Sequence, residues 1–420
     1  MRIIADLHVH SKYSRATSRD MTLPVIASWA ARKGIAVVGT GDFTHPAHFA
    51  SIQELLEPAE PGLFVLKGKK DKTSPARFML TAEVSNIYSH GGRTRKIHSL
   101  IFAPAFEAVK KMNAALARLG NVASDGMPIF GFSSQDLLKI VLDSDPASML
   151  VPAHAWTPWF SIFGSKSGFD SIEECYGGLS ANIFAIETGL SSDPAMNRRM
   201  TGLDDITLLS NSDAHSPSKL GREANVFDSE NMDYYELMRI IRERDKGKFL
   251  FTVEFYPQEG KYYADGHRNC GVCMTPTETR KSGGVCPVCG GLLTVGVLNR
   301  VEELADRPAG NMPQGAVPAR CLVPLTEILA EVLGVNANSV KVKREYQRLT
   351  NEAREFTILL DIEEKEIAKL AGERTAEAIM KVRNGELSIT PGFDGEFGKI
   401  KIFGKTPELT PKGPRQIGLF

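Results

Sequence analysis

The stretch Arg2-Ile-Ile-Ala-Asp-Leu-His-Val-His10 reads as a buried β-strand that ends in polar side chains. Successive side chains of a strand point to opposite faces, so Asp6, His8 and His10 share one face at the carboxyl end. Two imidazoles side by side can bind one metal ion. Taken alone, the pair is more simply explained as two structural histidines, so its meaning depends on the rest of the chain.

An alternation of strands and helices continues from this stretch to about residue 255. Near-continuous Ile, Val, Leu and Phe is typical of strands buried on both faces, as in parallel sheets. Helices are expected at Leu23–Lys33, closed by Gly34, at Ala105–Leu119, and at Gln135–Leu142 behind an N-cap at Ser133. The predicted strands are Arg2–His10, Ile35–Asp42, Arg77–Asn86, Lys96–Ala103, Ser148–Ala155, Ile183–Leu190 and Ile206–His215. Seven strand–helix units in a row predict an α/β barrel or a doubly wound sheet.

Further histidines and acids lie at or near the ends of these strands. Glu83, His154, Asp213 and His215 each follow an apolar run, and His98 lies early in the fourth strand. In parallel α/β folds, functional groups gather where strands run out into loops. Histidine and carboxylate without cysteine are the ligands of hydrolytic Zn, Mn or Fe centres. Two ions ~3.5–4 Å apart can activate a water and hold the attacking and leaving oxygens of a phosphoryl group, so the pattern predicts a multinuclear metal phosphoesterase.

Beyond residue 258 the alternation of strands and helices ends. Cys270, Cys273, Cys286 and Cys289 form two CxxC pairs separated by twelve residues in a segment with little apolar content. This spacing predicts one structural zinc ion bound by four cysteines, and a module this small needs the metal to fold. Such modules either contact nucleic acid or only brace a domain, and the sequence leaves both open. After a Pro- and Gly-rich linker, helices are expected at Leu325–Leu333, Val340–Glu355, Glu363–Leu370 and Glu373–Val382.

Overall composition excludes several classes of protein. Among 420 residues, 50 Lys and Arg balance 50 Asp and Glu, which excludes an acidic disordered chain and a globally basic nucleic-acid coat. No window approaches the roughly 18–20 apolar residues of a membrane span, and the N-terminus lacks the pattern of a signal peptide. We therefore expect a cytoplasmic protein with no membrane partner, in which Cys175 and Cys321 are ordinary thiols.

Several of these motifs resemble the polymerase-and-histidinol-phosphatase (PHP) family. The resemblance rests on His8-Val-His10-Ser11 with Tyr13-Ser14, on Gly39-Thr-Gly-Asp42, on Glu83 and His154, and on Asp213-Ala-His215. It implies a distorted (β/α)7 barrel. Carried over by position, His8, His10, Glu83 and Asp213 would bind a first catalytic metal, and Glu83, His98 and His154 a second. His215 would orient a phosphate or the leaving group, beside Asp213 and Glu83 as the catalytic carboxylates.

The chain departs from the PHP pattern at two places. Ser14-Arg15-Ala16 stands where many PHP sequences have Ser-Asp-Gly, whose acid helps hold a third metal. Asp42-Phe43-Thr44-His45 displaces the histidine of the usual Asp-His pair. These departures favour two catalytic ions (Zn²⁺, Mn²⁺ or Mg²⁺) over three.

Over its full length the chain is similar to the endonuclease Q family of DNA repair nucleases. Beyond the order barrel, zinc module and basic helical region, the similarity rests on His154-Ala-Trp-Thr-Pro-Trp159, Gly168-Phe-Asp-Ser171 and Pro391-Gly-Phe-Asp-Gly-Glu-Phe-Gly398. It implies cleavage of DNA on the 5′ side of deoxyuridine, deoxyinosine or an abasic site, which would leave a 3′-hydroxyl and a 5′-phosphate. The implied domains are 1–258 (PHP phosphoesterase), 259–300 (zinc module), 301–324 (linker) and 325–420 (basic helical region with tail).

Candidate DNA contacts follow from this similarity, each beside a plainer structural explanation. Trp156, Trp159 and Phe160 would stack on a flipped nucleotide or else pack the barrel rim. The cationic side chains would meet phosphates or else are solvated surface; they are Lys69, Lys70, Lys166, Lys341, Lys343, Arg344 and Arg348. The terminal Gln416-Ile-Gly-Leu-Phe420 loosely resembles a peptide that binds a replication clamp, though a frayed tail is the simpler expectation.

Two other functions stay open at this point. Several PHP barrels are small-molecule phosphatases, but such a substrate does not need residues 259–420. A non-catalytic DNA-binding protein with a decayed centre is suggested by Arg15 and Phe43, and it should hold only the zinc of the cysteine module.

Overall fold

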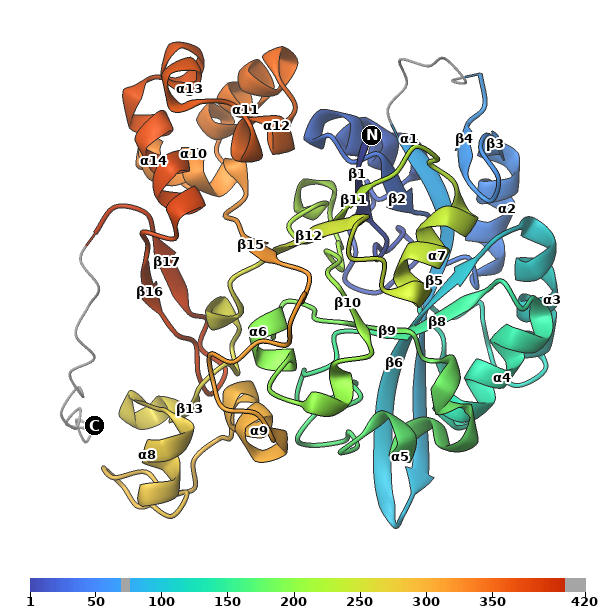
Figure 1. Ribbon diagram of the computed structural model, residues 1–420, viewed down its shortest axis with the longest axis horizontal. Helices are drawn as coiled ribbons and strands as arrows, with labels where there is room; N and C mark the ends of the chain where they lie inside the picture. The colour runs from blue at the N-terminus through green and yellow to red at the C-terminus, as the bar shows by residue number, and fades with distance from the viewer. Residues whose placement is uncertain (69–75, 405–420) are drawn as a thin grey trace, which may run out of the picture.

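A computed structural model describes residues 1–68 and 76–404. Lys69, Lys70 and the proposed clamp-binding peptide lie outside the described residues. The chain forms a mixed α/β domain with a group of helices near its C-terminal end (Figure 1). None of the helices in the described ranges combines the length and apolar character needed to cross a membrane.

All seven predicted strands are present, and they close into a barrel. They are β1 (Arg2–Asp6), β2 (Val37–Gly39), β5 (Arg77–His90), β6 (Arg93–Ala103), β8 (Met149–Pro152), β9 (Ala185–Glu187) and β10 (Thr207–Leu209). Pairing runs from β1 through β2, β5 and β6 to β8, and β9 pairs with β10. The N–H of Ala155 donates to the carbonyl of Glu187 and joins β8 to β9. A bridge between Val9 and Ala214 closes the circuit, so the predicted α/β barrel is confirmed.

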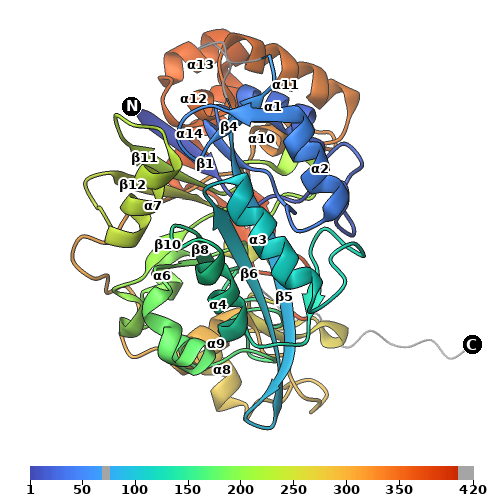
Figure 2. The same ribbon diagram turned by 90° about the vertical axis from the view of Figure 1, so that its right-hand side faces the viewer.

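One strand corrects the expectation of seven parallel strand–helix units. β6 is antiparallel to both β5 and β8, and no helix separates β5 from β6. The two strands form a long hairpin (Figure 2) whose turn contains Gly91 and Gly92, both at positive φ. Because β6 is reversed, its early residues lie at the same end of the barrel as the carboxyl ends of the parallel strands. His98, in the middle of β6 and paired with Ser85 of β5, lies at that end.

Strands that the sequence did not reveal extend the sheet outside the barrel. β11 pairs antiparallel with β1, and β12 and β15 follow it, so a strand from the expected linker forms the sheet edge. The strands besides the seven of the barrel are β3 (Leu56–Pro58), β4 (Phe64–Leu66), β7 (Ile129–Phe130), β11 (Ala224–Asp228), β12 (Phe249–Glu254), β13 (Asp265–His267), β14 (Val272–Met274), β15 (Ala319–Cys321), β16 (Ser388–Thr390) and β17 (Lys399–Lys401). Of these, β13 with β14 and β16 with β17 form two separate two-stranded sheets.

Helices around the barrel agree with local sequence signals. α1 ends at Gly34 in the left-handed conformation, and the hydroxyl of Ser133 caps α4 by accepting from the N–H of Asp136. Helices of the first 304 residues are α1 (Leu23–Lys33), α2 (Pro46–Leu55), α3 (Phe106–Ala117), α4 (Ser134–Ser144), α5 (Ile172–Tyr176), α6 (Pro194–Asn197), α7 (Tyr234–Glu243), α8 (Pro276–Lys281) and α9 (Val297–Leu304).

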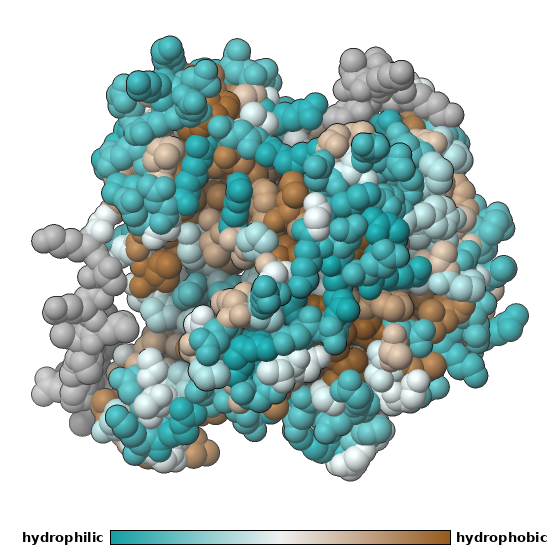
Figure 3. All heavy atoms as spheres, in the orientation of Figure 1, coloured by the Kyte–Doolittle hydropathy of each residue, from teal (hydrophilic) through white to brown (hydrophobic). Residues whose placement is uncertain are grey.

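The C-terminal helices pack against α1 (Figure 1). They are α10 (Leu325–Leu333), α11 (Val340–Glu352), α12 (Glu355–Leu360), α13 (Glu364–Ala371) and α14 (Glu373–Asn384). Of these, α12 was not expected. The ring of Trp29 lies 5.8 Å from that of Tyr346, and a buried ion pair of 2.8 Å joins Lys33 to Glu355. Polar side chains cover most of this face of the molecule, and apolar ones gather in the recess beneath the helices (Figure 3).

Candidate metal centre

Two groups of potential metal ligands meet at the barrel end where β1, β8 and β10 run out. One contains His8, His10, Glu83 and Asp213, and the other contains Glu83, His98 and His154. Within each group the ligand atoms lie within 4.8 Å of one another. These are the two sets that the sequence predicted for a first and a second metal.

Glu83 belongs to both groups because its two oxygens face different histidines. Oε2 lies 3.2 Å from His10 Nε2 and 3.5 Å from His8 Nε2. Oε1 lies 2.9 Å from His98 Nδ1 and 3.0 Å from His154 Nε2. A buried carboxylate placed this way can bridge two ions.

Two further carboxylates orient the histidines of β1. Oε2 of Glu187 lies 3.0 Å from Nδ1 of His8, and Oδ1 of Asp42 lies 3.0 Å from Nδ1 of His10. A carboxylate only accepts, so each Nδ1–H donates to it and each Nε2 is turned toward the centre. The sequence analysis assigned no role to Glu187. The available signal was its position at the end of an apolar run, which resembles the position of Glu83.

Asp42 also accepts from the hydroxyl of Ser11 at 2.6 Å and from that of Ser14 at 2.8 Å. Its carboxylate is therefore occupied in holding His10 and the loop that follows β1. The side chain of Arg15 pairs with Asp125 at 3.0 Å.

The electrostatics of the cluster hold its acids ionised. Burial disfavours the charged form of Glu83, but the neighbouring His98 and His8 outweigh it, so its pKa lies well below the ordinary value. Burial likewise lowers the pKa of His8, yet the charges of Glu187 and Glu83 raise it well above the ordinary value. The lowered pKa values of Glu83 and Asp213 keep both carboxylates in the ionised form that a metal ligand needs.

A divalent cation fits this arrangement. His8 Nε2 and Asp213 Oδ1 are buried without a hydrogen-bond partner, although each is a good ligand atom aimed at the centre. Asp42, His154 and Asp213 also have positive φ values of 44°, 30° and 47°, which non-glycine residues rarely adopt. Such strain gathers at functional sites, where surrounding contacts hold it in place.

His215 lies beside the first group, with its ring 4.4 Å from that of His10 and its side chain 40% exposed. Its Nδ1 donates to the carbonyl of Asp213 at 3.0 Å, which leaves Nε2 available. His215 is thus the histidine of the cluster that solvent or a substrate can reach most easily.

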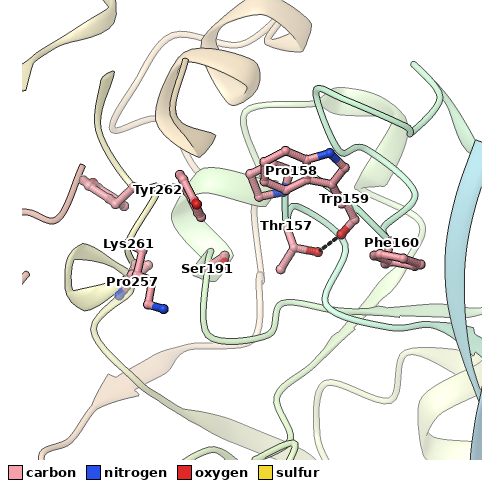
Figure 4. A pocket seen from close by; sticks show the side chains of 10 residues that line it. Thr157, Pro158, Trp159, Phe160, Ser191, Pro257, Lys261 and Tyr262 are labelled. Carbon is pink, nitrogen blue, oxygen red and sulfur yellow. Dashed lines mark hydrogen bonds between the residues drawn. The ribbon is translucent and has the colours of Figure 1, made fainter. Parts of the chain in front are cut away.

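An aromatic pocket of about 350 Å³ adjoins the second group (Figure 4). Trp159 and Phe160 lie on one side of it, and Lys261 and Tyr262 on the other. The ring of Phe160 lies 4.8 Å from that of His98, which brings the pocket next to the ligands.

Trp156 requires a correction. Of its two expected roles, stacking on a nucleotide is excluded: it is fully buried, its indole N–H donates to Asn197 Oδ1 at 2.7 Å, and it packs on Phe163. Trp159 in contrast is 40% exposed. The cationic candidates for DNA contact among the described residues are exposed; they are Lys166, Lys341, Lys343, Arg344 and Arg348.

The expected zinc ligands are brought together with one difference. Cys270, Cys286 and Cys289 gather with His267, whereas Cys273 is not part of this group. Sequence reasoning passed over His267 because the CxxC pattern accounted for four ligands without it.

Comparisons with known proteins extend over nearly the whole chain. The family model described as MJ0043 C-terminal domain matches residues 324–386. The uncharacterised protein YqxK of Bacillus subtilis is 30% identical over 412 residues, which are 95% of this chain and 99% of that protein. The crystal structure of the lesion-specific endonuclease PfuEndoQ from Pyrococcus furiosus superposes with a TM-score of 0.84 at 33% identity, covering 96% of this chain and 95% of that one.

A second solved structure is endonuclease Q in complex with a 27-mer duplex substrate that has an abasic lesion at the active site. It superposes with a TM-score of 0.82 at 32% identity and covers 96% of both chains. Identity above 30% across barrel, cysteine module and C-terminal helices shows that this chain belongs to the endonuclease Q family.

Proposed function

We propose that this protein is a metal-dependent DNA repair endonuclease that hydrolyses the phosphodiester on the 5′ side of a deaminated or missing base. The observation that carries the proposal is the position of Glu83, whose two oxygens face two separate ligand groups beside an aromatic pocket. Similarity across 96% of the chain to endonuclease Q, solved with a duplex substrate that has an abasic lesion at the active site, supports DNA as the substrate.

The proposed metal ligands are His8, His10, Glu83 and Asp213 for one ion, and Glu83, His98 and His154 for the other. When bound, two divalent ions would supply water activation and neutralise charge on the phosphoryl group. Glu187 and Asp42 keep the Nε2 atoms of His8 and His10 directed inward. His215, with its free Nε2, would contact the phosphate or the leaving oxygen.

Lesion recognition is assigned to the aromatic pocket. A damaged nucleotide leaves the base stack at lower cost than a paired base, and aromatic side chains can receive it. Trp159, Phe160 and Tyr262 supply such surfaces, and Lys261 supplies a positive charge at the same pocket. The exposed cations of α11 would hold the duplex through its phosphates, without reading sequence.

A nicking assay tests the proposal. End-labelled duplexes carrying one deoxyinosine, deoxyuridine or abasic site are incubated with Mn²⁺ or Mg²⁺, beside undamaged DNA. We expect a single cut 5′ to the lesion that disappears in Asp213→Ala and persists in Asp143→Ala, a matched change at an exposed position on α4. If no lesion-dependent cut appears with either metal, the proposal is refuted, and hydrolysis of small phosphomonoesters becomes the function to test.

A further inference from the structure

The cysteine module contains a histidine in a position that the CxxC pattern conceals. A ring nitrogen of His267 and the sulfur atoms of Cys270, Cys286 and Cys289 lie within 4.8 Å of one another. The Nδ1 atom of His267 is 3.6 Å from the sulfur of Cys289. One nitrogen and three sulfur atoms form a common ligand set for a structural zinc ion.

Strand pairing explains why His267 faces this cluster and Cys273 does not. In the β13–β14 hairpin, His267 pairs with Val272 and Gly266 pairs with Cys273. Directly paired residues of antiparallel strands point to the same face, and successive residues point to opposite faces. His267 and Val272 therefore share one face, and Cys273 lies on the other.

Packing identifies the first of these faces as that of the cluster. Val272 forms a small core with Cys286 and Leu293, and Cys270 and Met274 pack against it. Val272 and Met274 flank Cys273 in β14, so Cys273 points away from this core. The ring of Phe393 packs closely over Gly266, where a Cβ atom would come within 2.4 Å of it, so this position requires glycine.

The two turns that present the ligands have the same sequence pattern. His267-Arg-Asn-Cys270-Gly271 and Cys286-Pro-Val-Cys289-Gly290 each place two ligands three residues apart and end in glycine. Gly271 and Gly290 both have left-handed φ values, of 64° and 72°. The glycine that closes the first turn follows Cys270, so this turn ends before Cys273.

We propose that the structural zinc ion is bound by His267, Cys270, Cys286 and Cys289, and that Cys273 is a thiol that does not bind it. Three thiolates and a neutral imidazole give the zinc site a net charge of −1, whereas four thiolates would give −2. This inference concerns the ligand set alone and does not depend on the proposed nuclease activity.

The same turn is attached to a C-terminal motif that the catalytic centre does not use. Asp394 accepts from the N–H of Arg268 at 2.7 Å and from the hydroxyl of Thr294 at 2.6 Å. It holds these contacts at a φ of 45° in the segment Pro391–Gly398. The motif thus braces the turn that begins at His267.

Cobalt substitution of the full-length protein tests the ligand set. Thiolate-to-cobalt charge-transfer absorption reports only the cysteine module, because the two catalytic groups contain no cysteine. We expect Cys273→Ser to keep the wild-type charge-transfer intensity and Cys270→Ser to lose intensity. His267→Cys should raise the intensity by about a third, because four thiolates would then replace three.

The opposite pattern would overturn the proposal. If Cys273→Ser loses charge-transfer intensity while His267→Ala keeps it, the zinc ion is bound by four cysteines. His267→Cys decides the matter even if the alanine variant does not fold, since an unchanged spectrum in that variant would show that residue 267 is no ligand. Zinc release on titration of the thiols gives an independent readout of the same variants.

Discussion

Replacing Glu187 with glutamine tests whether this buried carboxylate orients the first ligand group. Oε1 accepts from Asn211 Nδ2 at 3.0 Å, and Oε2 accepts from the N–H of His154 at 2.9 Å. His8 Nδ1 lies 3.0–3.1 Å from both oxygens. In the amide, whichever position becomes NH₂ must face another N–H donor.

The neighbouring donors cannot easily rearrange. Asn211 Oδ1 already accepts from the N–H of Leu7 and from Asn225 Nδ2, both at 2.9 Å, so turning its amide would break two bonds. Loss of one bond to a charged group costs about 1.5–3 kcal/mol, and an unsatisfied buried donor about 1–3 kcal/mol. Because these costs overlap, we expect Glu187→Gln to lower the free energy of unfolding by about 2–4 kcal/mol.

Metal binding should weaken at the same time. A histidine that loses its carboxylate partner is less basic and less well oriented, and such changes typically weaken metal affinity 10–100-fold. Stability is measured by urea unfolding and affinity by calorimetric titration with Mn²⁺. Glu254→Gln is the control for Mn²⁺ affinity, which it should leave at the wild-type value, because Glu254 is equally buried but accepts from the hydroxyl of Thr188 and lies outside both ligand groups. Wild-type Mn²⁺ affinity in Glu187→Gln would refute the orienting role.

Three further predictions concern the barrel. Glu83→Gln should lose metal from both ligand groups, because each oxygen of Glu83 faces a different group. The metal content per chain, measured by plasma mass spectrometry, should fall by more than the content of one site. An unchanged metal content would contradict the shared position of Glu83. Burial raises the pKa of Glu254 to about 8 in the folded protein, above its value in the unfolded chain. The stability that protonated Glu254 contributes is therefore complete below pH about 4.5 and is lost as the pH rises through about 8. Glu254→Gln should therefore be nearly neutral at pH 5 and stabilising by on the order of a few kcal/mol at pH 9, as thermal unfolding at the two pH values would show. Gly189→Ala would place a Cβ atom 2.5 Å from the Cβ atom of His154, at a backbone φ of 62°. We therefore expect the free energy of unfolding to fall by about 1–3 kcal/mol and nicking to be slower. Gly178→Ala is the control and should behave as wild type in both assays, because its Cβ atom would have no neighbour within 4 Å.

Local signals in the sequence were sufficient for much of the framework. α1 begins and ends at the predicted residues because Pro24 and Gly34 act within a single turn of chain. The apolar runs of all seven barrel strands were recognisable because burial on both faces leaves few polar positions. The residues of both ligand groups were also found, since strand ends in such a barrel converge and each candidate directly followed an apolar run or lay on a strand.

Contacts between distant segments decided the rest. The reversal of β6, which carries His98 into the centre, depends on a hairpin pairing of whole strands and leaves no mark in apolar periodicity. Trp156 and Trp159 lie in one short motif, yet the fold buries the first and exposes the second. Cys273 satisfies the CxxC spacing, but strand register turns it away and brings His267 in. Spacing along the chain defines which ligand types are available, whereas the face on which each one lies is set by pairing and packing, which only the tertiary structure contains.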